Sequence, residues 1–136
     1  MSITRIQRLH AGAGRRVVPD IGDYDDASPA WTESEHRADL PGSASIAGFW
    51  EGEPGWVRID NWPYHEVCVV LAGRVAVEDA DGERVEFGAG EAFVVPRGFE
   101  GVWHTLESTK KVFVGVDPYP ETDADLSLAS DTEGAR

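Results

Sequence analysis

The sequence predicts an all-β fold, a jelly roll or a small closed barrel. From about residue 43 to residue 116, short alternating or apolar runs are separated by Gly, Pro and Asp, a pattern typical of closely spaced strands. One stretch, VAVEDADGERVEF, places Asp81 and Gly82 between two alternating runs, which predicts a β-hairpin. No window shows a sustained helical repeat, so we expect strands rather than helices to form the core.

The expected elements follow in chain order. Residues 3–9 alternate weakly and could form an edge strand, and the acidic, turn-rich residues 19–29 should form a loop. Eight strands are expected after them, at residues 45–50, 56–60, 67–71, 74–78, 84–87, 92–95, 101–104 and 111–116. Eight short strands at this spacing favour a closed or double-sheet architecture.

A chain of 136 residues with 41% hydrophobic residues can form one domain with a modest core. We expect an N-terminal arm with an edge strand and acidic loop at 1–42, a barrel at 43–117 and an acidic, disordered tail at 118–136. The net charge of -13 argues against nucleic acid or an anionic membrane as a partner. With one cysteine, no signal peptide and no membrane-length apolar stretch, a soluble cytoplasmic protein is expected.

Two sequence elements resemble the motifs of the cupin family. Glu66 and Gly73 match the glutamate-x6-glycine part of the first motif, and Gly90, Pro96 and Gly98 match the glycine-x5-proline-x-glycine of the second. The stretches GFWEGEPG, FGAGEAFVVPRGFEGVW and LESTKKVFV narrow the resemblance to small single-domain cupins grouped with ureidoglycine aminohydrolase and the ethanolamine-utilisation cupins. The resemblance implies a double-stranded β-helix of the RmlC-like jelly-roll type and a homodimer.

The metal-ligating histidines of the first cupin motif have no counterparts here. Asp60 and Trp62, or with a longer spacing Ile59 and Asn61, occupy their positions, and Gly101 stands where the second motif offers its histidine. Because transition metals in proteins usually need imidazole or thiolate ligands, we expect no tightly bound metal and no cofactor.

Strand alternation predicts which side chains face the barrel interior. If Glu66 points inward, then Asp60, Trp62, Tyr64 and Cys68 point with it, and His65 points away, unless a bulge at Pro63 turns it inward. On the facing strands, Trp103 and Lys111 should point inward, and His104 outward. This set forms an aromatic cup with two acids and one ammonium, which could bind a small molecule through Asp60, Trp62, Tyr64 and Trp103.

Glu66 and Lys111 are the candidate catalytic pair. Burial would oppose the charge of each while their proximity would favour it, so a perturbed carboxyl group could transfer protons. The same two residues could equally form a structural ion pair that connects two strands.

Three functions remain open at this point. The chain could be an enzyme of hydrolase or aminohydrolase type acting on a ureido, amino or keto acid, an expectation that comes from the resemblance. It could instead bind or sense such a metabolite without catalysis, or be an accessory protein whose barrel interior is only core. The fold by itself decides between none of them.

Overall fold

A computed structural model describes residues 2–120. The helices in this range are two short 3-10 turns, η1 (Ile3–Arg5) and η2 (Ile21–Asp23). The strands are β1 (Arg15–Val17), β2 (Asp26–Ala27), β3 (Glu33–Arg37), β4 (Ile46–Gly52), β5 (Gly55–Ile59), β6 (His65–Ala72), β7 (Arg74–Asp79), β8 (Arg84–Gly88), β9 (Ala92–Val95), β10 (Gly101–Thr105) and β11 (Thr109–Val116). The all-β prediction is confirmed.

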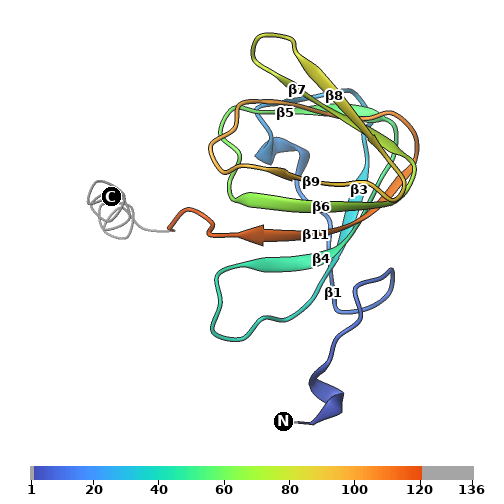
Figure 1. The fold of residues 1–136 in the computed structure, drawn as a ribbon, viewed down its shortest axis with the longest axis vertical. Coiled ribbons are helices and arrows are strands. Elements are labelled where there is room, and N and C mark those ends of the chain that lie inside the picture. The colour runs from blue at the N-terminus through green and yellow to red at the C-terminus, as the bar shows by residue number, and fades with distance from the viewer. Residues whose placement is uncertain (1, 121–136) are drawn as a thin grey trace.

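The strands form two antiparallel sheets. One has the order β1-β3-β4-β11-β6-β9 and the other the order β2-β5-β10-β7-β8. Figure 1 shows the sheets enclosing the barrel interior, with β7 and β8 at one end and the N-terminal segment extending from the other. Consecutive strands along the chain alternate between sheets in several places, as in β9, β10 and β11, which gives the jelly-roll arrangement.

Each of the eight strands expected from residue 45 onward is present, with its ends shifted by no more than two residues. The hairpin predicted at Asp81 and Gly82 joins β7 to β8, which pair from Arg74 with Gly88 to Glu78 with Arg84. The hairpin was predictable because Asp81 and Gly82 stand between two runs in which apolar residues recur at every second position.

The N-terminal segment differs from the expectation. The prediction of an edge strand at residues 3–9 is wrong, because this stretch contains η1. Strand β1 forms the edge of the sheet instead. The expected loop at 19–29 contains η2 and the two-residue strand β2, which pairs with β5. Strand β3, which was not predicted, pairs with β4 over five residues, from Glu33 with Gly52 to Arg37 with Gly48.

The acidic tail expected at residues 118–136 lies outside the described residues from 121 onward. Before that point, the backbone N–H of Tyr119 donates to the carbonyl of Pro63 at 3.3 Å, and its hydroxyl donates to Asn61 at 3.1 Å. None of the helices within residues 2–120 has the length and apolar character needed to cross a membrane.

The core consists of aromatic and branched apolar side chains between the sheets. Trp62, Cys68, Val70, Val75 and Phe113 are its most completely buried members. Gly73, the glycine of the first motif, has a positive φ of 90°, and a Cβ there would lie 2.3 Å from the carbonyl oxygen of Ser108. The motif glycine is therefore required by the backbone between β6 and β7.

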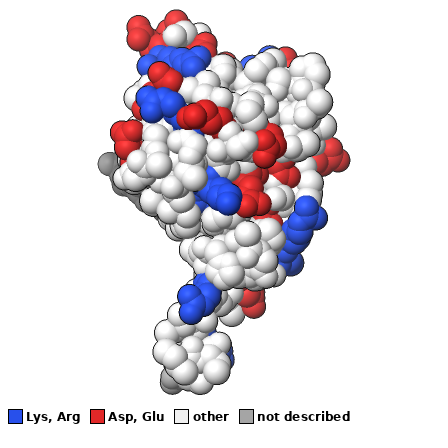
Figure 2. Space-filling view, turned by 90° about the vertical axis from the view of Figure 1, so that its right-hand side faces the viewer, with Lys and Arg blue, Asp and Glu red and all other residues white. Residues whose placement is uncertain are grey.

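Acidic and basic side chains are interspersed on the molecular face in Figure 2. The basic side chains there lie among acidic ones and form no continuous strip.

Candidate functional site

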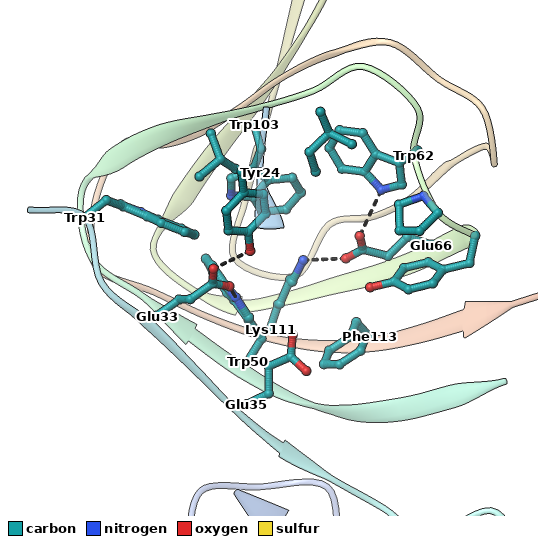
Figure 3. A pocket seen from close by; sticks show the side chains of 14 residues that line it. Tyr24, Trp31, Glu33, Glu35, Trp50, Trp62, Glu66, Trp103, Lys111 and Phe113 are labelled. Carbon is teal, nitrogen blue, oxygen red and sulfur yellow. Dashed lines mark hydrogen bonds and ion pairs between the residues drawn. The ribbon is translucent and has the colours of Figure 1, made fainter. Parts of the chain in front are cut away.

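A cavity of about 100 Å³ lies between the two sheets. Its walls come from β3, β4, β6 and β11 of one sheet, from β5 and β10 of the other, and from the loops that hold Tyr24, Trp31 and residues 62–64. One water molecule needs roughly 10–15 Å³ of cavity volume, so this cavity can hold several water molecules or a small organic molecule. Figure 3 shows Glu33 and Glu66 on opposite sides of this space, with Lys111 between them.

Glu66 and Lys111 form a buried ion pair across β6 and β11. The Nζ atom of Lys111 lies 2.5 Å from Oε2 of Glu66, and the side chains are 6% and 9% exposed. Trp62 Nε1 donates to Oε1 of Glu66 at 3.0 Å, and the Cys68 thiol donates to Oε2 at 3.1 Å. Both oxygens of this carboxylate are thus engaged by donors of the same chain.

Glu66 and Lys111 each stabilise the charged form of the other. Burial would raise the pKa of Glu66, but the Lys111 ammonium and the hydrogen bonds from Lys111, Cys68 and Trp62 hold it below its ordinary value. Burial would lower the pKa of Lys111, but the sulfur of Cys68 and the carboxylate of Glu66 raise it above its ordinary value. At neutral pH the pair is therefore fully charged.

The Lys111 ammonium also lies against aromatic rings. Its Nζ atom is 4.0 Å from the ring centroid of Trp103, 4.8 Å from that of Trp50 and 5.8 Å from that of Phe113. The negative faces of aromatic rings attract cations at these distances. The cavity walls are thus arranged to hold one ammonium group.

Glu33 is a second carboxyl group, half-buried on the opposite wall. The Tyr24 hydroxyl donates to its Oε2 and Trp50 Nε1 donates to its Oε1 at 2.7 Å. Burial raises the pKa of Glu33, although the bonds from Tyr24 and Trp50 counteract part of that effect. Burial, together with the charge of Glu33, also raises the pKa of Tyr24, so this phenol stays protonated.

Glu35 and Tyr64 keep free hydrogen-bonding capacity at the cavity. Arg37 Nε donates to Oε2 of Glu35 at 2.6 Å, and the Oε1 atom has no partner among the described residues. The Tyr64 hydroxyl likewise has none within residues 2–120, and burial, with Glu66 and Glu35 nearby, raises its pKa. Both residues also line an outer recess of about 480 Å³, so they stand where the cavity meets the surface.

Five of the six predicted site residues line the cavity: Trp62, Tyr64, Glu66, Trp103 and Lys111. The inward position expected for Asp60 is wrong. Its side chain is 47% exposed and forms an ion pair with Arg58 at 3.0 Å. The alternation counted back from Glu66 holds for Tyr64 and Trp62 but fails at Asp60, the first residue after β5 ends at Ile59.

Sequence reasoning missed the wall that the N-terminal segment supplies. Tyr24, Trp31, Glu33 and Glu35 all line the cavity, as does Trp50 from β4. Strand β3 reads ESEHR and has no apolar alternation, because its inward side chains are the acids of the cavity. The only available signal was alternation of charge, with Glu33, Glu35 and Arg37 at every second position.

The side chains around Glu66 do not fit a transition metal. The described residues contain no group of three or more His, Cys, Asp or Glu side chains placed to hold one. His65 Nδ1 accepts from the backbone N–H of Arg97 at 3.1 Å, and His104 pairs with Glu78 at 2.9 Å, so neither imidazole lines the cavity. Glu66 already has its charge neutralised by Lys111. No metal-dependent step is derived for this site.

Cys68 is expected to be chemically inert in the folded protein. The side chain is fully buried at 0% exposure, and burial raises the pKa of its thiol, so little reactive thiolate forms. Ellman's reagent should give no signal in native buffer and one thiol per chain in urea, since the chain has one cysteine. Rapid labelling of the native protein would show that the core around Cys68 opens to solvent.

Comparison with known proteins extends these observations. Residues 41–113, more than half of the chain, match the family described as EutQ-like cupin domain. The EutQ protein of Clostridium difficile has a similar structure, with 16% identity, a TM-score of 0.66, and coverage of 86% of this chain and 90% of that one. No curated protein matches the chain significantly.

Two further solved structures are similar. One, described as an ethanolamine utilization protein, EutQ, of Salmonella typhimurium LT2, has 20% identity, a TM-score of 0.59, and coverage of 82% of this chain and 92% of that one. The other, of unknown function from Rhizobium leguminosarum, has 23% identity, a TM-score of 0.54, and coverage of 62% and 80%. At such identities the likeness shows the fold alone.

Proposed function

Since the chain belongs to the EutQ-like cupin family, whose fold is compatible with many functions, we propose its function from the cavity. The barrel interior binds a small polar metabolite, and no tightly bound transition metal takes part. The cupin resemblance read from the sequence is confirmed. The ureido, amino or keto acid ligand that the resemblance implied stays a prediction, as does the homodimer.

One observation carries this proposal: hydrogen-bonding groups without partners lie beside aromatic walls. Glu35 Oε1 and the Tyr64 hydroxyl are available at the cavity, whereas the groups of Glu66 and Lys111 are engaged with each other. A few placed polar groups in an apolar, aromatic hollow are typical of small-molecule sites. Both groups are reached by solvent, since the one buried side-chain polar atom without a partner in residues 2–120 is Nδ1 of His36, and a ligand could therefore replace water at each of them.

The test is a screen of ureido, amino and keto acids, together with small amines. Binding to the folded state raises the melting temperature by mass action. Tryptophan fluorescence gives a second readout, because Trp31, Trp50, Trp62 and Trp103 line the cavity. We expect at least one compound to shift both signals in a saturable way.

A Tyr64→Phe variant localises any binding to the cavity. Removing only the hydroxyl should weaken binding of a polar hit by roughly three- to tenfold, the effect of one hydrogen bond. Tyr119→Phe is the matched control, because the Tyr119 hydroxyl contacts Asn61 outside the cavity. A screen without hits, or hits that bind both variants and the wild type equally, would contradict the proposal.

Catalysis is the second candidate function, and Glu33 favours it. The pKa of the Glu33 carboxyl group is raised toward neutral pH, which favours proton transfer there. The pKa of Glu66 is lowered, so that carboxyl group stays ionised. The Glu66–Lys111 pair is then a scaffold, and hydrolysis or deamination would depend on Glu33. If a hit is turned over, Glu33→Gln should abolish turnover and leave its binding measurable.

A further inference from the structure

The cavity is lined by more carboxyl groups than cationic side chains. Three carboxyl groups line it, from Glu33, Glu35 and Glu66, and Lys111 is the one cationic side chain among its lining residues. Lys111 lies 2.5 Å from Glu66 and is committed to it. Within residues 2–120, Glu33 receives only neutral donors, from Tyr24 and Trp50, and no cationic side chain forms an ion pair with it.

Glu35 is the carboxyl group at the edge of the cavity. It stands two residues from Glu33 on β3, so both side chains emerge on the same face of the strand. The guanidinium of Arg37 binds its Oε2 at 2.6 Å, but Arg37 lines the outer recess and not the inner cavity. The Oε1 atom of Glu35 remains available as an acceptor.

The aromatic walls also favour positive charge. Trp103 and Trp50 already hold the Lys111 ammonium at 4.0 Å and 4.8 Å from their ring centroids. Trp31 packs beside Trp50 with 6.3 Å between ring centroids, and Tyr24 packs on Trp31, so the aromatic wall continues past Glu33. A second cation beside Glu33 would meet the same kind of ring face.

The outer recess that leads to the cavity is also lined mainly by acidic residues. The outer recess shares Tyr24, Glu35 and Tyr64 with the cavity, and its carboxylates are Glu35, Asp23, Asp25 and Asp60. Arg37 is the basic residue that lines it, and Arg58 nearby pairs with Asp60 and Asp26. An acidic opening raises the local concentration of cations and repels anions.

We propose that the cavity binds a small organic cation carrying a primary ammonium group. Its N–H groups donate to Glu33 and to the free Oε1 of Glu35, and its carbon chain lies against the rings of Trp31 and Trp103. This inference rests on the proposed function and narrows it: an amine, or an amino compound without a net negative charge, binds in preference to a carboxylic acid.

The test compares three probes of nearly equal size that differ in charge: propylammonium, 1-propanol and propionate. Each is titrated into the full chain at neutral pH and constant ionic strength, with tryptophan fluorescence and melting temperature as readouts. We expect saturable binding of propylammonium, at least about tenfold weaker binding of 1-propanol, and no binding of propionate, because a charge-assisted hydrogen bond is worth a tenfold factor or more.

Three variants connect the effect to the two acids. Glu33→Gln and Glu35→Gln each keep the side-chain shape and remove one charge, and each should weaken propylammonium binding by about tenfold. Glu100→Gln is the control, because Glu100 is exposed and lies outside the cavity. Binding by the Glu33→Gln/Glu35→Gln double variant as tight as that of the wild type would overturn the inference.

The outcomes separate this inference from the function on which it rests. If propionate, 1-propanol or an uncharged or anionic compound from the screen binds in the cavity while propylammonium does not, the charge inference fails and the binding function stands. If neither the three probes nor any compound of the screen binds, both fail.

Discussion

Replacing Lys111 with Met is expected to lower the free energy of unfolding by about 3–5 kcal/mol, the typical effect of leaving a buried charge without its partner. Met keeps the length of the side chain and its packing against Trp103, but Glu66 then stays buried without a counter-charge. Urea unfolding followed by tryptophan fluorescence measures the change.

The neighbouring residue provides the control. Lys110 is exposed on the same strand, so Lys110→Met should change stability by no more than about 0.5 kcal/mol. The double variant Glu66→Gln/Lys111→Met should recover most of the loss, because the glutamine carries no unpaired charge and its side-chain oxygen can still accept from Trp62. A Lys111→Met protein as stable as the wild type would mean that Glu66 takes up a proton at little cost.

The ion pair also predicts how stability depends on pH. The folded-state pKa of Glu66 is lowered, so its contribution is present above the ordinary carboxyl value of about 4.3 and is lost as the pH falls through the folded value. The pKa of Lys111 is raised, so its contribution is present below about 10.4 and is lost as the pH rises through the higher folded value. Between these limits the pair should contribute equally at every pH.

Gly101→Ala is expected to destabilise the protein by about 2–3 kcal/mol or more, as overpacking of a tight site does. A Cβ at Gly101 would lie 2.2 Å from the carbonyl oxygen of Glu78 and 2.5 Å from the ring of Phe99. Backbone cannot move aside as a flexible side chain can, so β10 would have to shift against β7. Thermal and urea unfolding both measure the loss.

Gly22→Ala is the matched control, because the nearest atom to a Cβ there is a side-chain oxygen of Asp20 at 3.4 Å. It should change stability by no more than about 0.5 kcal/mol. The prediction also concerns the cupin motif: Gly101 stands where metal-binding cupins offer a histidine, and this backbone does not admit a side chain there. A Gly101→His protein with unchanged stability would contradict that conclusion.

The strands that the sequence predicted are those whose inward side chains are apolar. Val67 to Leu71 and Ala92 to Val95 are short continuous apolar runs, and both lie in strands. Strand β3 was not predicted because the side chains that it turns toward the cavity, Glu33 and Glu35, are acids, so the strand shows no apolar alternation. Sequence periodicity therefore found the barrel and missed one wall of its cavity.

Three of the predicted site residues lie on strands. Glu66, Trp103 and Lys111 lie on β6, β10 and β11, and strand alternation placed all three correctly. Trp62 and Tyr64, in the loop between β5 and β6, also line the cavity as predicted, whereas Asp60 at the start of that loop pairs with Arg58 at the surface. The contact of Tyr24 with Glu33 joins separate segments and has no local sequence signal.

A crystal structure determined after soaking with the hits of the metabolite screen and with propylammonium tests the central claim most directly. We predict an ordered ligand between Trp31 and Trp103, within hydrogen-bonding distance of Glu35 or Tyr64, while Lys111 remains paired with Glu66. A cavity that contains only water, with every ligand bound on the outer surface, would contradict the claim that the barrel interior is a small-molecule site.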